Sequence, residues 1–180
     1  LVRRMPIIGS TLIKSQLYPL STLSFDTVII DECSQASITL ALLGMVKGKK
    51  WILVGDDKQH LPIFRTLKDP EKHSAFVSLL NKFPHRIKML RIHRRSHPEI
   101  IGFSAKYIYE EGIKPAEECR NQVLKIKSDH PVLNERPVVF IHVEGKEEKD
   151  GRSKFNSKEI EVCNKLVEEL RKYLSPEKIG

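Results

Sequence analysis

Two places in the chain combine carboxylates and carboxamides at a spacing that suits metal-assisted hydrolysis. Asp31-Glu32 and Asp56-Asp57 each follow a short apolar run, and Gln35 and Gln59 come shortly after them. If the two runs are neighbouring strands, the acids gather at the sheet edge where α/β proteins bind ligands. Such a group could hold Mg²⁺ through bridging waters while one acid orients a nucleophilic water. A single acidic strand end is more simply a solvated turn or a helix N-cap, but two related ones favour chemistry.

The elements that would position these acids alternate between strands and helices. By β-branched content and length, strands are expected at residues 6–13, 26–32, 49–57, 86–92 and 136–145. Helical spacing of apolar residues predicts helices at 73–83 and 156–174, and two further helices are expected at 35–48, ending at Gly48, and at 98–109. This alternation predicts an α/β fold with a mostly parallel sheet and flanking helices.

Several local features refine this expectation. The apolar run within 49–57 is continuous, which is typical of a strand covered on both faces. Asn156 or Ser157 is expected to cap the last helix. The charged segments 114–136 and 144–155 are predicted to be exposed loops, and a domain boundary is expected between residues 85 and 95.

Composition narrows the class of partner and compartment. The net charge of +8 favours a polyanionic partner, nucleic acid before acidic lipid. Cys33, Cys119 and Cys163 are widely spaced, which predicts neither a zinc site nor a disulfide framework and favours a reducing compartment, the cytoplasm or a nucleus. No stretch approaches the length of a membrane span, so no membrane association is expected.

Four short segments, in order, resemble motifs of the superfamily 1 nucleotide-hydrolysing helicases, in the branch of the RNA-surveillance helicases and the lagging-strand helicase-nucleases. The family's D-E-x-x-Q motif resembles "DECSQ", and its G-D-x-x-Q-L-P-P motif resembles "GDDKQHLP". Its Q-Y-R-M-H-P-like segment resembles "HRRSHPEI", and its N-x-x-E-A signature resembles "NSKEI". The resemblance spans most of the chain.

This resemblance implies roles for the matching residues. Asp31 would bind Mg²⁺ through water, and Glu32 would orient or deprotonate the attacking water. Gln59 would sense the γ-phosphate of ATP, and Gln35 would help to position it. Arg95 would reach the same phosphate as an arginine finger, because a planar, permanently charged guanidinium suits charge spread over several oxygens. Its alternative is a surface ion pair.

Other matches carry weaker implications. Asp56 and Glu159 are candidate nucleotide-binding residues, but Glu159 with Asn156 could equally be a helix cap and a first-turn acid. Arg94 stands where the family often has a Tyr, and its guanidinium could stack on the base. "GSTL" resembles the family's backbone-contacting segment, so Ser10 and Thr11 are candidate nucleic-acid contacts or an ordinary strand end. His93 and His97 are expected to be structural.

A phosphate-binding loop of the form GxxxxGK[ST] does not occur in the sequence. The resemblance places that loop before Leu1, so residues 1–90 and 91–180 are expected to be parts of two tandem RecA-like lobes. The implied parent is an ATP-dependent helicase or translocase on single-stranded DNA or RNA, with 5′-to-3′ movement suggested by the branch. Alone, the chain is expected to lack ATPase activity and to associate through exposed sheet edges. The alternatives are a non-catalytic nucleic-acid-binding or interaction module, and a metal-dependent nuclease or phosphohydrolase.

Overall fold

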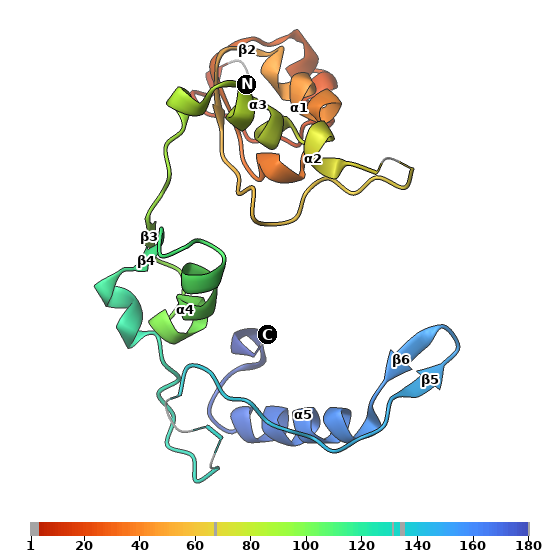
Figure 1. Ribbon diagram of the computed structural model, residues 1–180, viewed down its shortest axis with the longest axis vertical. Coiled ribbons are helices and arrows are strands. Elements are labelled where there is room, and N and C mark those ends of the chain that lie inside the picture. The colour runs from red at the N-terminus through yellow and green to blue at the C-terminus, as the bar shows by residue number, and fades with distance from the viewer. Residues whose placement is uncertain (1–3, 67, 131, 134–135, 180) are drawn as a thin grey trace. The chain divides into compact units, whose positions relative to one another are not determined.

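The computed structural model describes residues 4–66, 68–130, 132–133 and 136–179. The chain divides into two compact units, Leu1–Met89 and Leu90–Gly180 (Figure 1). The first unit contains β1 (Phe25–Ile30), α1 (Ile38–Met45), β2 (Gly48–Leu53), α2 (Pro70–His73) and α3 (Ala75–Lys82). The second contains β3 (Ile92–His93), α4 (Pro98–Tyr107), β4 (Lys114–Pro115), β5 (Glu148–Asp150), β6 (Ser153–Phe155) and α5 (Ser157–Leu170).

In the first unit, β1 and β2 pair in parallel and α1 connects them, as the alternating pattern predicts. The register places Ile30 opposite Leu53, so both strands end at the same edge. Ser37 caps α1 by accepting a hydrogen bond from the Leu40 amide at 3.2 Å. The buried core comprises Ile30, Cys33, Ala36, Ala41, Met45 and Ala75. This small core joins the end of β1 to α1 and α3.

Two expectations about this unit need correction. The helix expected at 35–48 ends at Met45, and Gly48 begins β2 instead. A Cβ on Gly48 would lie 2.6 Å from Val28 Cγ2, so this glycine permits the close approach of the two strands. The continuous apolar run of β2 does not have both faces covered within the described residues, because Trp51 is 51% exposed.

The strand expected at 6–13 is absent. These residues are irregular and lead into the short 3-10 helix η2 (Lys14–Gln16). The Oγ1 atom of Thr11 accepts a hydrogen bond from the Lys14 amide at 3.3 Å, and Leu12 packs against the core. Local β-branched content is not sufficient for a strand, because a strand also needs a neighbour with which to exchange backbone hydrogen bonds.

In the second unit, β3 and β4 pair in parallel, and β5 and β6 form an antiparallel hairpin. The hairpin turns at Gly151, whose φ of +58° suits a residue without a Cβ. α4 and α5 confirm two expected helices, and Asn156 is the N-cap of α5, accepting from the Lys158 amide at 3.1 Å.

Other expectations for the second unit fail. Of the run expected at 86–92, only Ile92 lies in a strand, as the first residue of β3, and residues 136–145 form none. The charged segments expected to be loops contain the hairpin and the 3-10 helix η6 (Glu117–Asn121). Strand pairing depends on long-range partners, whereas a two-residue turn can close a hairpin locally even in a charged sequence.

The fold is therefore a mixed α/β arrangement of small sheets. The expected mostly parallel sheet is present only in part, because the described residues contain three two-stranded sheets, two parallel and one antiparallel. Among the same residues, no helix has the length and apolar character needed to cross a membrane.

Candidate functional site

The turn after β1 carries the first acid–amide pair. Glu32 adopts a left-handed conformation, with φ 52° and ψ 35°, and its amide donates to Asp31 Oδ1 at 3.1 Å. The chain then enters the 3-10 helix η4 (Cys33–Gln35), in which the side-chain Nε2 of Gln35 donates a hydrogen bond to Glu32 Oε2 at 3.0 Å. Both carboxylates are exposed at the end of a parallel strand. They are thus presented to solvent at the edge where α/β sheets bind ligands.

The turn after β2 carries a second pair of the same kind. Gln59 Nε2 donates to Asp56 Oδ2 at 2.7 Å, and the Lys58 amide donates to Asp56 Oδ1 at 3.0 Å. An aspartate that accepts from the backbone two residues ahead stabilises a turn. Each turn therefore holds an acid and a glutamine three residues apart, joined by a side-chain hydrogen bond.

Backbone contacts hold the two turns at one edge. The Val54 amide donates to the Ile30 carbonyl at 2.9 Å, and the Cys33 amide donates to the Val54 carbonyl at 2.8 Å. Gly55 lies so close to the first turn that a Cβ there would be 2.9 Å from the Ser34 nitrogen. The expectation that β1 and β2 are neighbours is correct, and with it the placement of both motifs at one edge.

Ser34 and Ser74, which the sequence did not single out, link these segments. Ser34 is 1% exposed and Ser74 is 0% exposed. The Asp56 amide donates to Ser34 Oγ at 3.3 Å, and Ser74 Oγ donates to the Ser34 carbonyl at 3.0 Å. The only signal in the sequence is the position of Ser34 inside "DECSQ". Its hydrogen bond with the second turn could not be predicted, because Asp56 is 22 residues away in the sequence.

Cys33, the neighbour of Ser34, has a structural role. Its side chain is buried, and burial raises the pKa of the thiol to about 11. A thiol with so high a pKa stays protonated at neutral pH and is a poor nucleophile or metal ligand. Its contribution is packing against the end of β1.

The acidic edge, that is, the two turns with Asp31, Glu32 and Asp56 at the carboxyl ends of β1 and β2, would suit a magnesium ion that is held mainly by a bound substrate. No three His, Cys, Asp or Glu residues form a metal-binding group in the part of the chain that the structure describes. Mg²⁺ keeps several waters and is commonly bound through one or two carboxylates together with substrate phosphates. The exposed carboxylate of Asp31 matches that mode of binding and does not form an all-protein cage.

The second unit contains the arginine candidates. Arg94 Nη1 forms an ion pair with the carboxylate of Glu118 in η6. Arg95 is exposed and makes no ion pair with any other residue that the structure describes. The surface ion pair that was the alternative role for Arg95 is thus not formed among the described residues; the neighbouring Arg94 forms one instead.

The two histidines around these arginines close local turns. His93 Nε2 accepts a hydrogen bond from the Ser96 amide at 2.9 Å, and His97 Nδ1 accepts from the Glu99 amide at 3.2 Å at the start of α4. Their structural role agrees with the expectation from the sequence.

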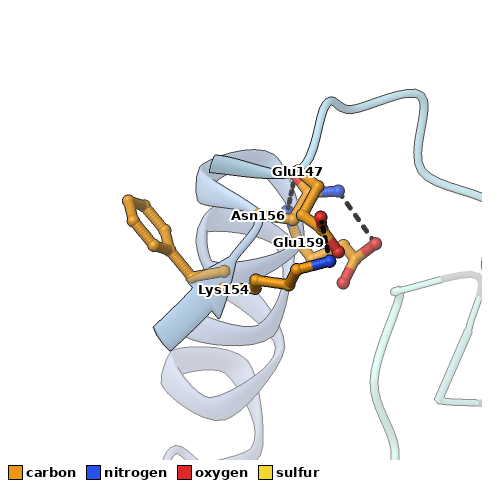
Figure 2. Close-up of a pocket in the computed structure, with 5 residues that line it drawn as sticks. Glu147, Lys154, Asn156 and Glu159 are labelled. Carbon is orange, nitrogen blue, oxygen red and sulfur yellow. Dashed lines mark hydrogen bonds and ion pairs between the residues drawn. The ribbon is translucent and has the colours of Figure 1, made fainter. Parts of the chain in front are cut away.

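The fourth motif forms a helix cap. Asn156 Oδ1 accepts from the amides of Lys158 and Glu159, and Asn156 Nδ2 donates to Glu159 Oε1 at 2.9 Å. Figure 2 shows these two residues beside Glu147 and Lys154. Lys154 Nζ lies 2.8 Å from Glu147 Oε1, and the four side chains line a pocket of about 230 Å³. The capping alternative is realised here, because the two side chains hydrogen-bond to each other and Asn156 Oδ1 accepts from amides in the first turn of α5.

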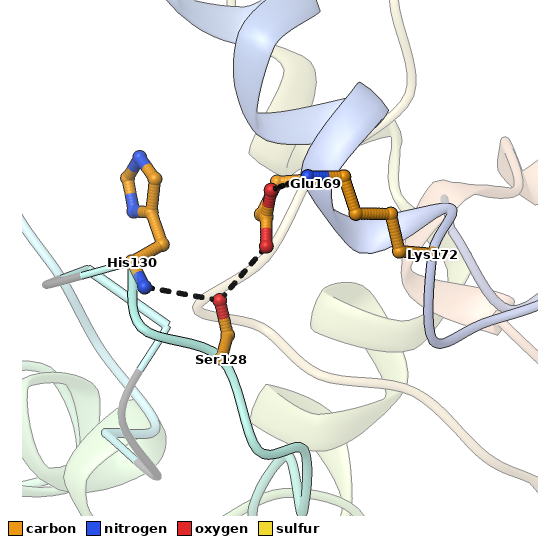
Figure 3. A network of polar contacts seen from close by, with 4 residues as sticks. All are labelled: Ser128, His130, Glu169 and Lys172. Atoms are coloured by element: carbon orange, nitrogen blue, oxygen red, sulfur yellow. Dashed lines mark hydrogen bonds and ion pairs between the residues drawn. The ribbon is translucent and has the colours of Figure 1, made fainter.

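A polar network near the end of α5 was not predicted from the sequence. Ser128 Oγ donates to Glu169 Oε1 at 3.0 Å and accepts from the His130 amide at 3.1 Å, as Figure 3 shows. Lys172 Nζ donates to Glu169 Oε2 at 2.5 Å. The hydrogen bond from Lys172, and next that from Ser128, hold the pKa of Glu169 below its usual value. This network attaches the irregular segment around Ser128 to α5.

The nucleic-acid candidates Ser10 and Thr11 are exposed. Ser10 Oγ donates to the Thr11 carbonyl at 3.0 Å, while the Thr11 hydroxyl accepts from Lys14. Both hydroxyls thus serve a local turn, and they remain open to solvent on one side.

Comparisons with known proteins agree with these motifs. Residues 71–180 and residues 1–65 match two families that are each described as an AAA domain. An "uncharacterized ATP-dependent helicase" of Methanocaldococcus jannaschii is 36% identical over 162 residues, which cover 84% of this chain and 24% of that protein. Helicase sen1 of Schizosaccharomyces pombe is 30% identical over 155 residues, covering 83% of this chain and 9% of that protein.

A third relative is regulator of nonsense transcripts 1 of Dictyostelium discoideum, which is 28% identical over 172 residues, covering 93% of this chain and 13% of that protein. The chain thus spans about a quarter or less of the length of these relatives. The matched AAA-domain family covers more than half of the chain. The chain belongs to the superfamily 1 helicases with AAA domains, in the branch that includes sen1 and regulator of nonsense transcripts 1.

Proposed function

We propose that this chain supplies the acidic edge of the ATP site in an ATP-dependent helicase that moves along single-stranded DNA or RNA. The observation that carries the proposal is the pair of acid–amide turns held at one edge of the parallel strands β1 and β2. The names of two relatives, an ATP-dependent helicase and helicase sen1, support the same activity. Residues 1–90 and 91–180 would belong to two RecA-like lobes that close on ATP, and 5′-to-3′ movement fits the branch.

The residues divide the chemistry among them. Mg²⁺ would neutralise developing charge on the phosphates when bound. Asp31 would hold that ion through water, and the carboxylate of Glu32 would orient or deprotonate the attacking water. Gln35 Nε2 donates to Glu32 Oε2 at 3.0 Å and would thereby orient that carboxylate. Gln59 would contact the γ-phosphate from the second turn.

The remaining candidates extend this site. Arg95 would stabilise the charge on the transferred phosphoryl group, for which an exposed guanidinium is suited. Asp56 would orient Gln59 through an exposed hydrogen bond that Gln59 can exchange for a phosphate oxygen, while Arg94 and Glu159 would contact nucleotide only after leaving Glu118 and Asn156. Ser10 and Thr11 would offer hydroxyls to the nucleic-acid backbone.

The cysteines support the proposed compartment, and strand edges support the proposed association of the isolated chain. Cys33, Cys119 and Cys163 are free thiols, which suits a reducing compartment such as the cytoplasm or a nucleus. β1 and β2 form a two-stranded sheet among the described residues, and their outer edges support the proposed association of the isolated chain through exposed strand edges.

The test uses the full-length protein that contains this chain, with Mg-ATP and single-stranded RNA or DNA. Glu32→Gln is expected to lower ATP turnover by about 10²-fold or more while ATP still binds, because it removes the base but not the site. Glu161→Gln is the matched control: Glu161 forms an exposed ion pair with Lys165 on α5, and turnover should not change.

Two results would contradict the proposal. Cleavage of nucleic acid with Mg²⁺ but without ATP, lost in Asp56→Ala, would identify a nuclease. A binding module would be identified by two results together: Glu32→Gln and Asp56→Ala leave nucleic-acid binding unchanged, and neither the unmutated protein nor any variant turns over ATP.

A further inference from the structure

The two acid–amide turns are joined through buried serine hydroxyls. Ser34 Oγ accepts from the Asp56 amide at 3.3 Å, and this amide begins the turn that closes on Gln59. Ser34 itself lies between Glu32 and Gln35, inside the first turn. A displacement of Ser34 would therefore change the distance between the two turns.

Ser74 fixes Ser34 from the other side. Its hydroxyl donates to the Ser34 carbonyl at 3.0 Å and accepts from the Val77 amide at 3.4 Å, at the N-terminus of α3. A backbone hydrogen bond supports the same contact, because the Ala75 amide donates to the Ala36 carbonyl at 3.1 Å. A fully buried hydroxyl that both donates and accepts has few alternative orientations, because water does not replace a lost partner.

We propose that Ser34 and Ser74 are positioning residues for ATP hydrolysis. Ser74 anchors the first turn to α3, and Ser34 carries that anchor to the Asp56 amide, so that Glu32 and Gln59 keep the separation that the reaction needs. Neither serine touches the reacting atoms. The inference rests on the proposed function, and it adds two residues that no comparison assigns.

The first measurement is independent of activity. In the full-length protein, Ser34→Ala is expected to speed amide hydrogen exchange in residues 55–59, because the Asp56 amide loses its acceptor. Ser37→Ala is the matched control. Its hydroxyl caps α1 by accepting from Leu40, so faster exchange should appear in residues 38–45 and not in 55–59. Unchanged exchange of residues 55–59 in Ser34→Ala would overturn the link.

The second measurement is ATP turnover. Ser34→Ala should lower kcat about tenfold with the KM for ATP changed less than about twofold, because positioning matters most in the transition state. Ser74→Ala should lower kcat less, since the bond between Ser34 and Asp56 remains. Ser37→Ala should leave kcat unchanged. A Ser34→Ala protein with faster exchange at 55–59 and full kcat would overturn the positioning role.

A double-variant cycle separates positioning from general destabilisation. If Ser34 acts through the second turn, Ser34→Ala should cost little additional kcat once Gln59→Ala is present. Fully additive effects would overturn the proposal. If the full-length protein has no ATP turnover, the proposed function fails, whereas the exchange measurement still decides whether Ser34 holds the two turns together.

Discussion

Gln59 Nε2 donates a hydrogen bond to Asp56 Oδ2 at 2.7 Å, and both side chains are exposed or partly exposed. A hydrogen bond at such a surface contributes little net stability, because water replaces either partner. Gln59 can therefore leave Asp56 at low cost. This is what the proposed contact of Gln59 with a phosphate oxygen requires.

Replacing Gln59 by Ala should lower kcat for ATP by about 10²-fold, since in the proposed function it removes a donor to the developing charge on the γ-phosphate. The melting temperature should change little. Gln16→Ala is the matched control, because Gln16 Nε2 donates to the Leu43 carbonyl at 2.7 Å and connects η2 to α1. That control should lower the melting temperature and retain full turnover; the opposite pattern would remove Gln59 from the site.

The backbone of Glu32 makes a separate prediction. Its φ of 52° is unfavourable for a residue with a Cβ, so Glu32→Gly should raise the free energy of unfolding by about 0.5–1 kcal/mol while abolishing turnover. Glu111, with φ 61°, is the control: Glu111→Gly should stabilise the protein similarly and keep its turnover. Urea denaturation checks the stability, and a destabilised Glu32→Gly protein would argue against the left-handed conformation.

Gly55 and Gly102 should respond to alanine with opposite signs. An alanine Cβ at Gly55 would lie 2.9 Å from the Ser34 nitrogen and 3.0 Å from Phe76 Cδ2, so Gly55→Ala should lower the free energy of unfolding by about 1–3 kcal/mol. At Gly102, inside α4, nothing lies within 4 Å of the same position. Gly102→Ala should therefore raise the free energy of unfolding by about 0.5–1 kcal/mol. Equal responses in urea denaturation would contradict the close approach at Gly55.

The network around Glu169 predicts a pH dependence. Lys172, followed by Ser128, lowers the pKa of Glu169 in the folded protein below its ordinary value of 4.5. Because the folded pKa is the lower one, this carboxylate stabilises the fold above pH 4.5, and the stabilisation is lost as the pH falls through the folded pKa. Thermal unfolding should show Glu169→Gln less stable than the parent at pH 7 and equal to it at low pH.

Glu168→Gln is the control for this prediction, because Glu168 is the exposed neighbour on the same helix and acts on Lys172 only through a weaker charge interaction, without the hydrogen bond that Glu169 accepts. Its melting temperature should follow that of the parent protein across the pH range. A Glu169→Gln protein that differs from the parent equally at pH 7 and at low pH would show that the loss comes from packing rather than from charge.

The amino-acid sequence by itself determined the elements whose signals are local. The helices α3, α4 and α5 follow from apolar spacing within one segment, and Asn156 caps α5 because its side chain reaches amides only two and three residues ahead. The motif residues Asp31, Glu32, Asp56 and Gln59 were identifiable for the same reason, since each turn is a contiguous stretch with its own spacing.

Only the tertiary structure decided which apolar runs become strands and how the two turns meet. Residues 6–13 and 136–145 have strand-forming composition but remain irregular, whereas β1 and β2 find each other across α1. Ser34 could not be recognised, because its importance arises from contacts with Asp56 and Ser74, 22 and 40 residues away. Pairing and buried hydrogen bonding depend on partners distant in the chain, so local composition does not encode them.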